Sequence, residues 1–285
     1  MAYITRRQWL KSAAFAAGTC ALGSYSLRAE EALYTGGAPN AEKLGWRIGV
    51  QLYSFHTITF QEAVQKAASI GLKWGEAYPG HKLAPDRDVT FGAMSEDDKK
   101  FVKNLLADYG FRLHGMGVGG YDRAAFEFAK EFGMETLICE PAVEDFDAIE
   151  DLVKEYGINL SIHNHPKPSI YWDYHKVLEV CEGRDARIGA RVDDNHMVRS
   201  GIDPVEGIRA LKGRIISFHF GDLDANKEDV PIGSGIANIP AIMTELKAQG
   251  FKGVFPIEFE KNPGQNLAEI AAGVKFADEY AKTLL

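Results

Sequence analysis

The stretch Ile158-Asn-Leu-Ser-Ile-His163-Asn-His165-Pro166 ends a short apolar run with two histidines that stand two positions apart. A short apolar run bounded by turn residues is typical of a buried strand. Because residues two apart on a strand share a face, His163 and His165 are expected to point the same way. We predict a strand over Asn159–His163, and the rest of the chain repeats this pattern.

Seven further apolar runs predict strands at Arg47–Tyr53, Lys73–Ala77, Arg112–Gly117, Thr136–Glu140, Ala190–Asp193, Ile215–Phe220 and Gly253–Glu258. Helix-like segments lie between them, and several end at a glycine just before the next strand, such as Gly110 and Gly157. Strands that alternate with helices indicate parallel βαβ units. Eight such units fit a closed barrel better than an open sheet. The sequence therefore predicts an α/β protein that forms a single (β/α)8 TIM barrel.

The N-terminus differs from the rest of the chain. It has a basic start with Arg6, Arg7 and Lys11, an apolar stretch from Ala13 to Gly23, and a small-residue end at Ala29. This order is typical of an export signal, and the arginine pair resembles a twin-arginine signal. An ordinary amphipathic helix is the alternative.

We therefore expect a signal peptide over residues 1–29, a linker over residues 30–45 and the barrel over residues 46–285. The mature protein is expected to be periplasmic or secreted.

Charge and length limit the partners of the protein. The formal net charge is −8, and removing the predicted signal, which holds four basic and no acidic residues, lowers it to −12. An acidic body is a poor fit to a polyanion, so we expect no nucleic-acid partner. Past the N-terminus no apolar run reaches the roughly 20 residues of a membrane span, so we expect no stable span. The sequence does not determine the oligomeric state, and a homo-oligomer remains one of the alternatives.

Acidic and imidazole side chains gather at the predicted strand tips. In a (β/α)8 barrel the active site lies at these carboxyl ends. Such groups would repel one another, or shift their pKa values, unless a cation lies between them. Mixed carboxylate and imidazole ligands suit Mn²⁺, Zn²⁺, Co²⁺ or Mg²⁺ without choosing among them, so the sequence predicts a divalent metal site. The tips carry Glu76, Glu140, His163, His165, Asp193, His196, His219 and Glu258.

Several motifs at these tips are specific to a family. They are Ile162-His-Asn-His165, Asp193-x-x-His196, Phe218-His-Phe-Gly-Asp222 and the final-strand Glu258. With them the chain resembles the sugar phosphate isomerase/epimerase family of xylose-isomerase-like TIM barrels, from about Trp46 to the C-terminus. The resemblance implies that Asp193, His219 and Glu258 bind the metal and that His196 contacts the substrate. A sugar-like small molecule is the implied substrate.

One position departs from that resemblance. The ketose epimerases have a glutamate as the metal ligand on strand five, where this chain has His163. We expect His163 to bind the metal, with Glu140 supplying a carboxylate from the strand before. The predicted metal ligands are thus Glu140, His163, Asp193, His219 and Glu258, and the predicted catalytic residues are Glu258, His165, His196 and Glu76.

These residues favour a metal-dependent isomerase or epimerase that acts on a sugar or keto-sugar through an enediolate. A metal-dependent lyase or hydratase acting on 3-keto-glycosides is the alternative, because elimination needs only one base and an acid at the leaving group. Two further classes are an endonuclease, which the acidic body disfavours, and a sugar-binding barrel without catalysis.

Overall fold

The computed structural model describes residues 32–285. The predicted export signal, and the cellular location inferred from it, lie outside the described residues. In the described part of the chain, no helix combines the length and apolar character that crossing a membrane requires.

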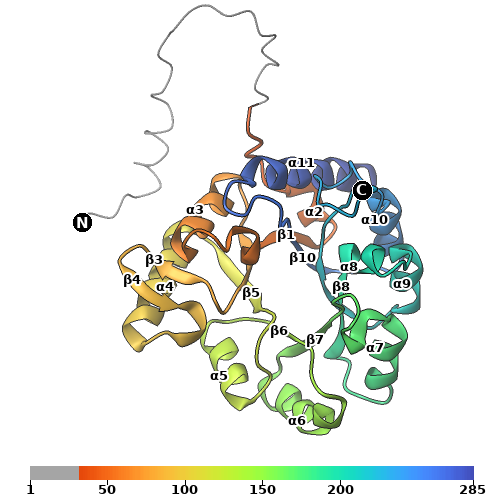
Figure 1. The fold of residues 1–285 in the computed structure, drawn as a ribbon, viewed down its shortest axis with the longest axis horizontal. Helices are drawn as coiled ribbons and strands as arrows, with labels where there is room; N and C mark the ends of the chain where they lie inside the picture. Colours follow the sequence, from red (N-terminus) through yellow and green to blue (C-terminus); the bar gives the residue numbers. More distant parts are fainter. Residues whose placement is uncertain (1–31) are drawn as a thin grey trace, which may run out of the picture.

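Eight parallel strands form the wall of a barrel, in the order β10-β1-β2-β5-β6-β7-β8-β9 (Figure 1). They are β1 (Trp46–Gln51), β2 (Trp74–Ala77), β5 (Arg112–Met116), β6 (Thr136–Cys139), β7 (Asn159–His163), β8 (Ile188–Asp193), β9 (Ile215–His219) and β10 (Gly253–Ile257). The barrel closes between β9 and β10, where Phe220 forms a parallel bridge with Ile257. The predicted α/β class and single-domain TIM barrel are confirmed, and each predicted strand lies within two residues of its expected place.

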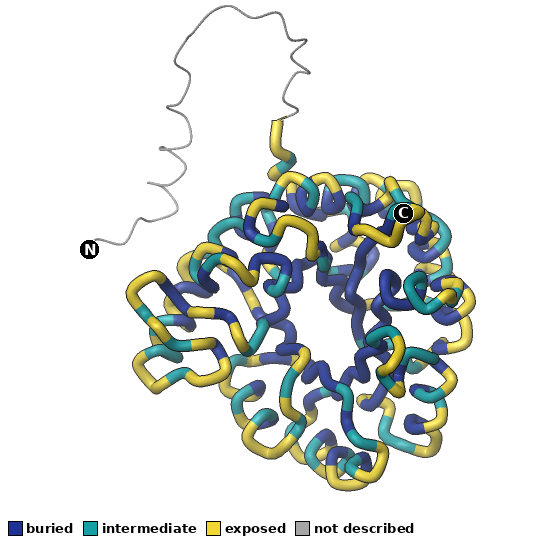
Figure 2. Tube along the Cα trace, viewed as in Figure 1, coloured by how far each residue is buried: buried dark blue, intermediate teal, exposed yellow. Residues whose placement is uncertain are grey.

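The main helices surround the strands (Figure 1). They are α3 (Phe60–Ser69), α4 (Glu96–Tyr109), α5 (Arg123–Glu131), α6 (Phe146–Tyr156), α7 (Tyr174–Cys181), α9 (Pro204–Ala210), α10 (Ile239–Ala248) and α11 (Leu267–Thr283). Local chemistry sets their ends. Ser95 and Asp98 form a capping box at the start of α4, and Gly110 ends it with a φ of 58°. Figure 2 shows buried positions concentrated on the strands and on the inner faces of the helices.

The segment expected to be a linker differs from that expectation. Part of it forms α2 (Pro39–Lys43), which lies against α11. The Asp278 carboxylate of α11 accepts hydrogen bonds from the backbone N–H of Asn40 at 2.6 Å and of Ala41 at 3.0 Å. A carboxylate thus satisfies the free donors at this helix start, which anchors the segment to the barrel.

A small antiparallel hairpin was also not predicted. It consists of β3 (Lys82–Ala84) and β4 (Arg87–Thr90), inserted between β2 and α4. These strands are too short to show a clear alternation of apolar and polar residues.

The barrel interior below the strand tips contains polar side chains. Arg191 of β8 is fully buried, and its Nη2 lies 2.5 Å from Oε2 of Glu76 on β2. Its Nη1 donates to the Ser217 hydroxyl at 2.9 Å, and that hydroxyl bonds to Ser161. A buried guanidinium would be costly without such partners. The floor of the barrel mouth therefore holds a buried charge pair between Arg191 and Glu76.

Candidate functional site

Asp193 both ends β8 and begins the short helix α8 (Asp194–Arg199). Its Oδ1 accepts a hydrogen bond from the backbone N–H of His196 at 2.7 Å, as in a helix N-cap. The Asn164 side chain holds the Asp193 backbone, accepting from its N–H at 2.7 Å and donating to its carbonyl at 3.0 Å. The Asp-x-x-His spacing is therefore that of a cap, which leaves the second carboxylate oxygen for the site.

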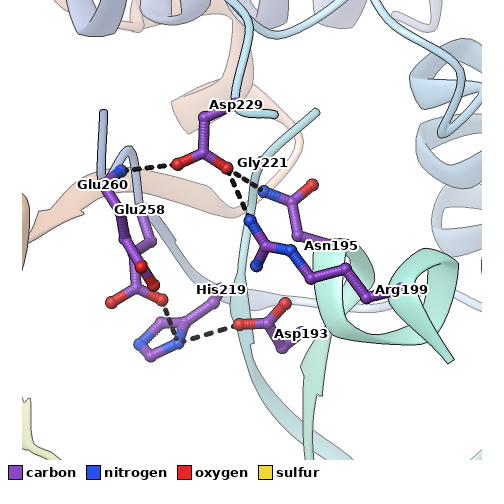
Figure 3. Close-up of a pocket in the computed structure, with 8 residues that line it drawn as sticks. All are labelled: Asp193, Asn195, Arg199, His219, Gly221, Asp229, Glu258 and Glu260. Atoms are coloured by element: carbon purple, nitrogen blue, oxygen red, sulfur yellow. Dashed lines mark hydrogen bonds and ion pairs between the residues drawn. The ribbon is translucent and has the colours of Figure 1, made fainter. Parts of the chain in front are cut away.

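Three of the predicted ligands, His163, Asp193 and Glu258, converge on the ring of a fourth, His219; Figure 3 shows Asp193 and Glu258 beside that ring. Nδ1 of His219 lies 2.9 Å from Oε2 of Glu258 and 3.4 Å from Oδ2 of Asp193. It also lies 3.1 Å from Nε2 of His163, which is buried. The strands β7, β8 and β9 supply one of these side chains each, and Glu258 directly follows β10. The structure therefore brings His163, Asp193, His219 and Glu258 together at one end of the barrel.

Glu76 lies on the other side of the His219 ring. Its Oε1 is 3.0 Å from Nε2 of His219 and accepts from Gln51 at 2.5 Å. Its Oε2 is ion-paired with Arg191 and lies 3.3 Å from Nε2 of His114. Glu76 was predicted as a catalytic residue, but its carboxylate is fully buried among these groups. Its position suits the orientation of His219 rather than contact with a substrate.

Burial of the acidic groups changes their proton affinity. Burial and, to a lesser extent, the nearby Glu258 carboxylate together raise the pKa of Asp193 to about 7. Burial, together with the charge of Glu76, raises the pKa of Glu258 to about 6, although His196 and Arg191 oppose the shift. Burial holds the pKa of His163 well below its usual value, so its ring is neutral. Two carboxylates and a neutral imidazole thus face one another, and the imidazole does not balance the negative charge of the carboxylates.

The donor chemistry at this point fits a divalent cation. If Nε2 of His219 donates to Glu76, its Nδ1 presents a lone pair toward Glu258, Asp193 and His163. Lone pairs that face each other at about 3 Å require a proton or a cation between them. Two imidazole nitrogens with two carboxylate oxygens are ligands that Mn²⁺, Zn²⁺ and related ions accept.

Glu140, which was predicted as a metal ligand, has partners at the barrel mouth. It accepts hydrogen bonds from Nδ1 of His165 and from the Ser169 hydroxyl. Burial raises the pKa of Glu140, but these two bonds lower it below its usual value. The same contact raises the pKa of His165, whose side chain remains 43% exposed. The structure thus joins Glu140 and His165 into an acid–imidazole pair, with the His165 ring 4.1 Å from that of His163.

His196 follows the cap residue Asp193 by one helical turn. Its Nε2 lies 3.6 Å from Oδ2 of Asp193, and Arg199 donates to its Nδ1 at 3.2 Å. Burial lowers the pKa of His196 to about 4, so the ring is neutral at physiological pH. Within the described residues, two groups of three side chains lie close enough to hold an ion. They are His163 with Asp193 and His219, and His163 with His165 and His196.

The loop after β9 is organised by Asp222. This buried carboxylate accepts from the backbone N–H groups of Leu223, Gly233, Gly235 and Ala237, at distances from 2.8 to 3.0 Å. The loop it gathers carries Asp229 to the edge of the site, where Asp229 meets Arg199 and the backbone of Glu260 (Figure 3). Asp222 is thus a structural acid that shapes one side of the mouth.

The sequence assigned no role to several residues that hold the site residues in place. Arg191 stands two positions before Asp193, so alternation along β8 would have placed both inside the barrel. Asn164 lies between two predicted site histidines, yet nothing in its spacing points to its bond with the β8 backbone. Gln51 and His114 touch Glu76 from β1 and β5, the two strands that pair with β2 in the sheet.

Comparison with known proteins agrees with this architecture. Residues 138–280, about half of the chain, match the family model of the xylose isomerase-like TIM barrel. The rhizopine catabolism protein MocC of Rhizobium meliloti is 26% identical over 159 residues, which cover 45% of this chain. That match spans 48% of MocC, so the chain aligns with about half the length of this relative.

Solved structures share the fold over most of their length. A protein of Parabacteroides distasonis is 28% identical, with a TM-score of 0.68 over 82% of this chain and 99% of its own. A D-tagatose 3-epimerase-like protein is 18% identical, with a TM-score of 0.68 over 84% of this chain and 98% of its own. A Mycobacterium smegmatis barrel in complex with magnesium is 13% identical, with a TM-score of 0.68 and the same coverages. The chain therefore belongs to the xylose isomerase-like TIM barrel family, as its strand-tip motifs predicted.

Proposed function

We propose that this protein is a divalent-metal-dependent isomerase or epimerase of a sugar or keto-sugar. The observation that carries the proposal is the convergence of His163, Asp193, His219 and Glu258 at the barrel mouth. The D-tagatose 3-epimerase-like structure and the magnesium-bound barrel support this assignment through their shared fold.

Two groups here can transfer protons: Glu258, which is one of the four side chains, and His165, whose ring lies 4.1 Å from that of His163. Glu258 follows β10, and His165 follows β7, three strands away around the barrel. A substrate between them would have one proton-transfer group on each side. His165 with Glu140 thereby takes the place of the strand-five glutamate that this chain lacks.

The reaction follows from the properties of these groups. A divalent cation at the convergent side chains supplies Lewis acidity to a substrate carbonyl, which acidifies the neighbouring C–H. Glu258 lies at the end of β10 beside the other convergent side chains, where its carboxylate can remove the proton and return it. Glu140 holds Nδ1 of His165, so the exposed face of that ring can exchange a proton through Nε2. Return of the proton to the same carbon from the other side inverts it, and return to the neighbouring carbon isomerises the sugar.

Incubation of the metal-loaded protein with ketoses in D₂O tests the proposal. We expect deuterium at the carbon next to the carbonyl, with all substituents retained. His165→Gln and Glu258→Gln should each lower the exchange rate by roughly 100-fold or more, as expected for loss of a general acid or base. His175→Gln is the matched control, because His175 pairs with Asp173 at 2.7 Å on the exposed start of α7. Equal rates in all three variants would contradict the assignment.

The lyase alternative has one observation in its favour, the histidine at position 163 where the ketose epimerases have a glutamate. Incubation of the same protein with 3-keto-glycosides distinguishes the two reactions. Release of an aglycone or of water would favour the lyase, and deuterium uptake with retention of the substituent would favour the isomerase.

We also propose that the mature protein acts outside the cytoplasm, on the basis of the arginine pair and the apolar stretch that follows it. N-terminal sequencing of the protein from the periplasmic fraction tests this, with an N-terminus close to residue 30 expected. An intact N-terminus in the cytoplasmic fraction alone would contradict it.

A further inference from the structure

Arg199 is held between two partners at the edge of the site, His196 and Asp229; Figure 3 shows its contact with Asp229. Its Nη1 lies 3.2 Å from Nδ1 of His196, one turn earlier on α8, and its Nη2 lies 3.0 Å from Oδ1 of Asp229. Asp229 is itself fixed, because it accepts from the Asn195 side chain at 3.3 Å and from the Glu260 backbone at 2.8 Å. The guanidinium is therefore fixed against the His196 ring from the side opposite the metal ligands.

The contact between Arg199 and His196 determines where the imidazole carries its proton. A guanidinium has five N–H donors and no acceptor. Nδ1 of His196 must therefore accept the bond with its lone pair. In a neutral ring the proton then lies on Nε2, the nitrogen that faces Oδ2 of Asp193 at 3.6 Å.

We propose that Arg199 and Asp229 are positioning residues that fix His196, which the family resemblance places against the substrate, as the Nε2–H tautomer. This tautomer can donate a hydrogen bond to a substrate oxygen but has no Nε2 lone pair for a metal. The contact with substrate rests on the proposed function, whereas the tautomer rests on geometry alone. Two groups of side chains among residues 32–285 could hold an ion, and with this tautomer only the group of His163, Asp193 and His219 offers three ligand atoms. In the other group, a protonated Nε2 on His196 has no lone pair to offer.

Nitrogen NMR of the full chain, labelled with ¹⁵N-histidine, tests the tautomer without any substrate. The His196 signals are assigned by their loss in His196→Gln. We expect Nε2 to show a directly bonded proton and Nδ1 to show none, both before and after addition of Mg²⁺. In Arg199→Met both tautomers should appear, whereas Arg199→Lys, which keeps a donor, should retain more of the Nε2–H form. Arg187→Met is the control, since Arg187 forms an exposed pair with Asp185.

A proton on Nδ1 in the unaltered protein would overturn the proposal. So would loss of the Nε2 proton when Mg²⁺ or Zn²⁺ is added, because this would show metal binding by His196. If Arg199→Met fails to fold, Asp229→Asn provides a second test, since it releases the guanidinium and should also mix the tautomers.

Metal titration separates the role of His196 from that of the ligands. His196→Gln should change the Mn²⁺ dissociation constant by less than the roughly 10-fold that disturbing a ligand or its orienting partner costs. Asp193→Asn should weaken binding beyond that limit. Equal losses in the two variants would place His196 among the ligands and refute the inference. If no sugar is turned over at all, the proposed function fails while the NMR and titration results still decide the tautomer.

Discussion

The ring of His219 bridges the site and its floor, because Nε2 lies 3.0 Å from Oε1 of Glu76 while Nδ1 faces the converging ligands. A carboxylate behind a metal-binding imidazole fixes both the tautomer and the orientation of the ring. Glu76 is fixed in turn by Arg191 and Gln51. The orientation of His219 in the candidate metal site is therefore determined by the layer of side chains below it.

Glu76→Gln should disturb both binding and stability. We expect metal affinity to fall by roughly 10- to 100-fold, since the orienting acceptor is weakened. The free energy of unfolding should fall by about 3–5 kcal/mol, because the buried Arg191 loses its counter-charge. Metal titration and urea unfolding measure the two effects. Glu135→Gln, which breaks the exposed pair with Arg47, should cost only about 0–1 kcal/mol. Equal costs in the two variants would contradict the role of Glu76.

Two substitutions at Asp193 should separate its two roles. Asparagine can still cap α8, so Asp193→Asn should lose the metal but keep the cap. Asp193→Ala should lose the metal and, in addition, about 0.5–2 kcal/mol of stability from the missing cap. Elemental analysis gives the metal content, and thermal unfolding in the presence of a chelator gives the stability. If asparagine retained the metal, Asp193 would not be a ligand.

Stability should depend on pH differently with and without metal. In the metal-free fold the pKa of Asp193 is raised from 3.8 to about 7 and that of Glu258 from 4.5 to about 6. The folded state therefore binds more protons than the unfolded state in this range, so these groups lower stability as pH rises from about 4 to 7. A bound cation offsets this loss, because it replaces the protons.

The rise in Tm on adding Mn²⁺ should consequently be larger at pH 8 than at pH 5. Differential scanning calorimetry over this pH range measures the difference, and Asp193→Asn should flatten the metal-free profile. A metal-induced shift in Tm that did not change with pH would show that the ion binds elsewhere.

Asp222→Asn should loosen the loop after β9. An asparagine keeps one acceptor oxygen but turns an N–H₂ group toward backbone donors, so we expect a loss of about 1–3 kcal/mol. Limited proteolysis should show faster cleavage between residues 223 and 237. Asp86→Asn, at an exposed position in the β3–β4 turn, serves as the control. Unchanged cleavage would mean that other contacts hold the loop.

The barrel could be predicted because local signals repeat along the chain. Each strand is a short apolar run, and several helices end at a glycine such as Gly110. The helix α2 could not be predicted in the same way, since its start is satisfied by Asp278 near the other end of the chain. No pattern around Asn40 indicates a partner so distant in sequence.

The sequence predicted which residues of the candidate site lie at strand tips, but it did not predict which of them contact one another. Alternation along β7 and β8 places His163 and Asp193 at the mouth. Which carboxylate meets which imidazole depends on distances across the barrel. Glu140 was expected beside the metal and lies against His165, while Glu76 lies against His219. The first pairing joins the ends of the adjacent strands β6 and β7, and the second crosses the barrel from β2 to β9, so both depend on tertiary structure that a single sequence does not encode locally.

The ion pair between Arg191 and Glu76 joins the two halves of the chain, since β2 belongs to the first four barrel strands and β8 to the last four. Either half alone would carry an uncompensated charge on the surface that it must bury on assembly. Half-barrel fragments of this protein are therefore expected to be unstable when expressed separately. Co-expression of both halves should restore the folded domain.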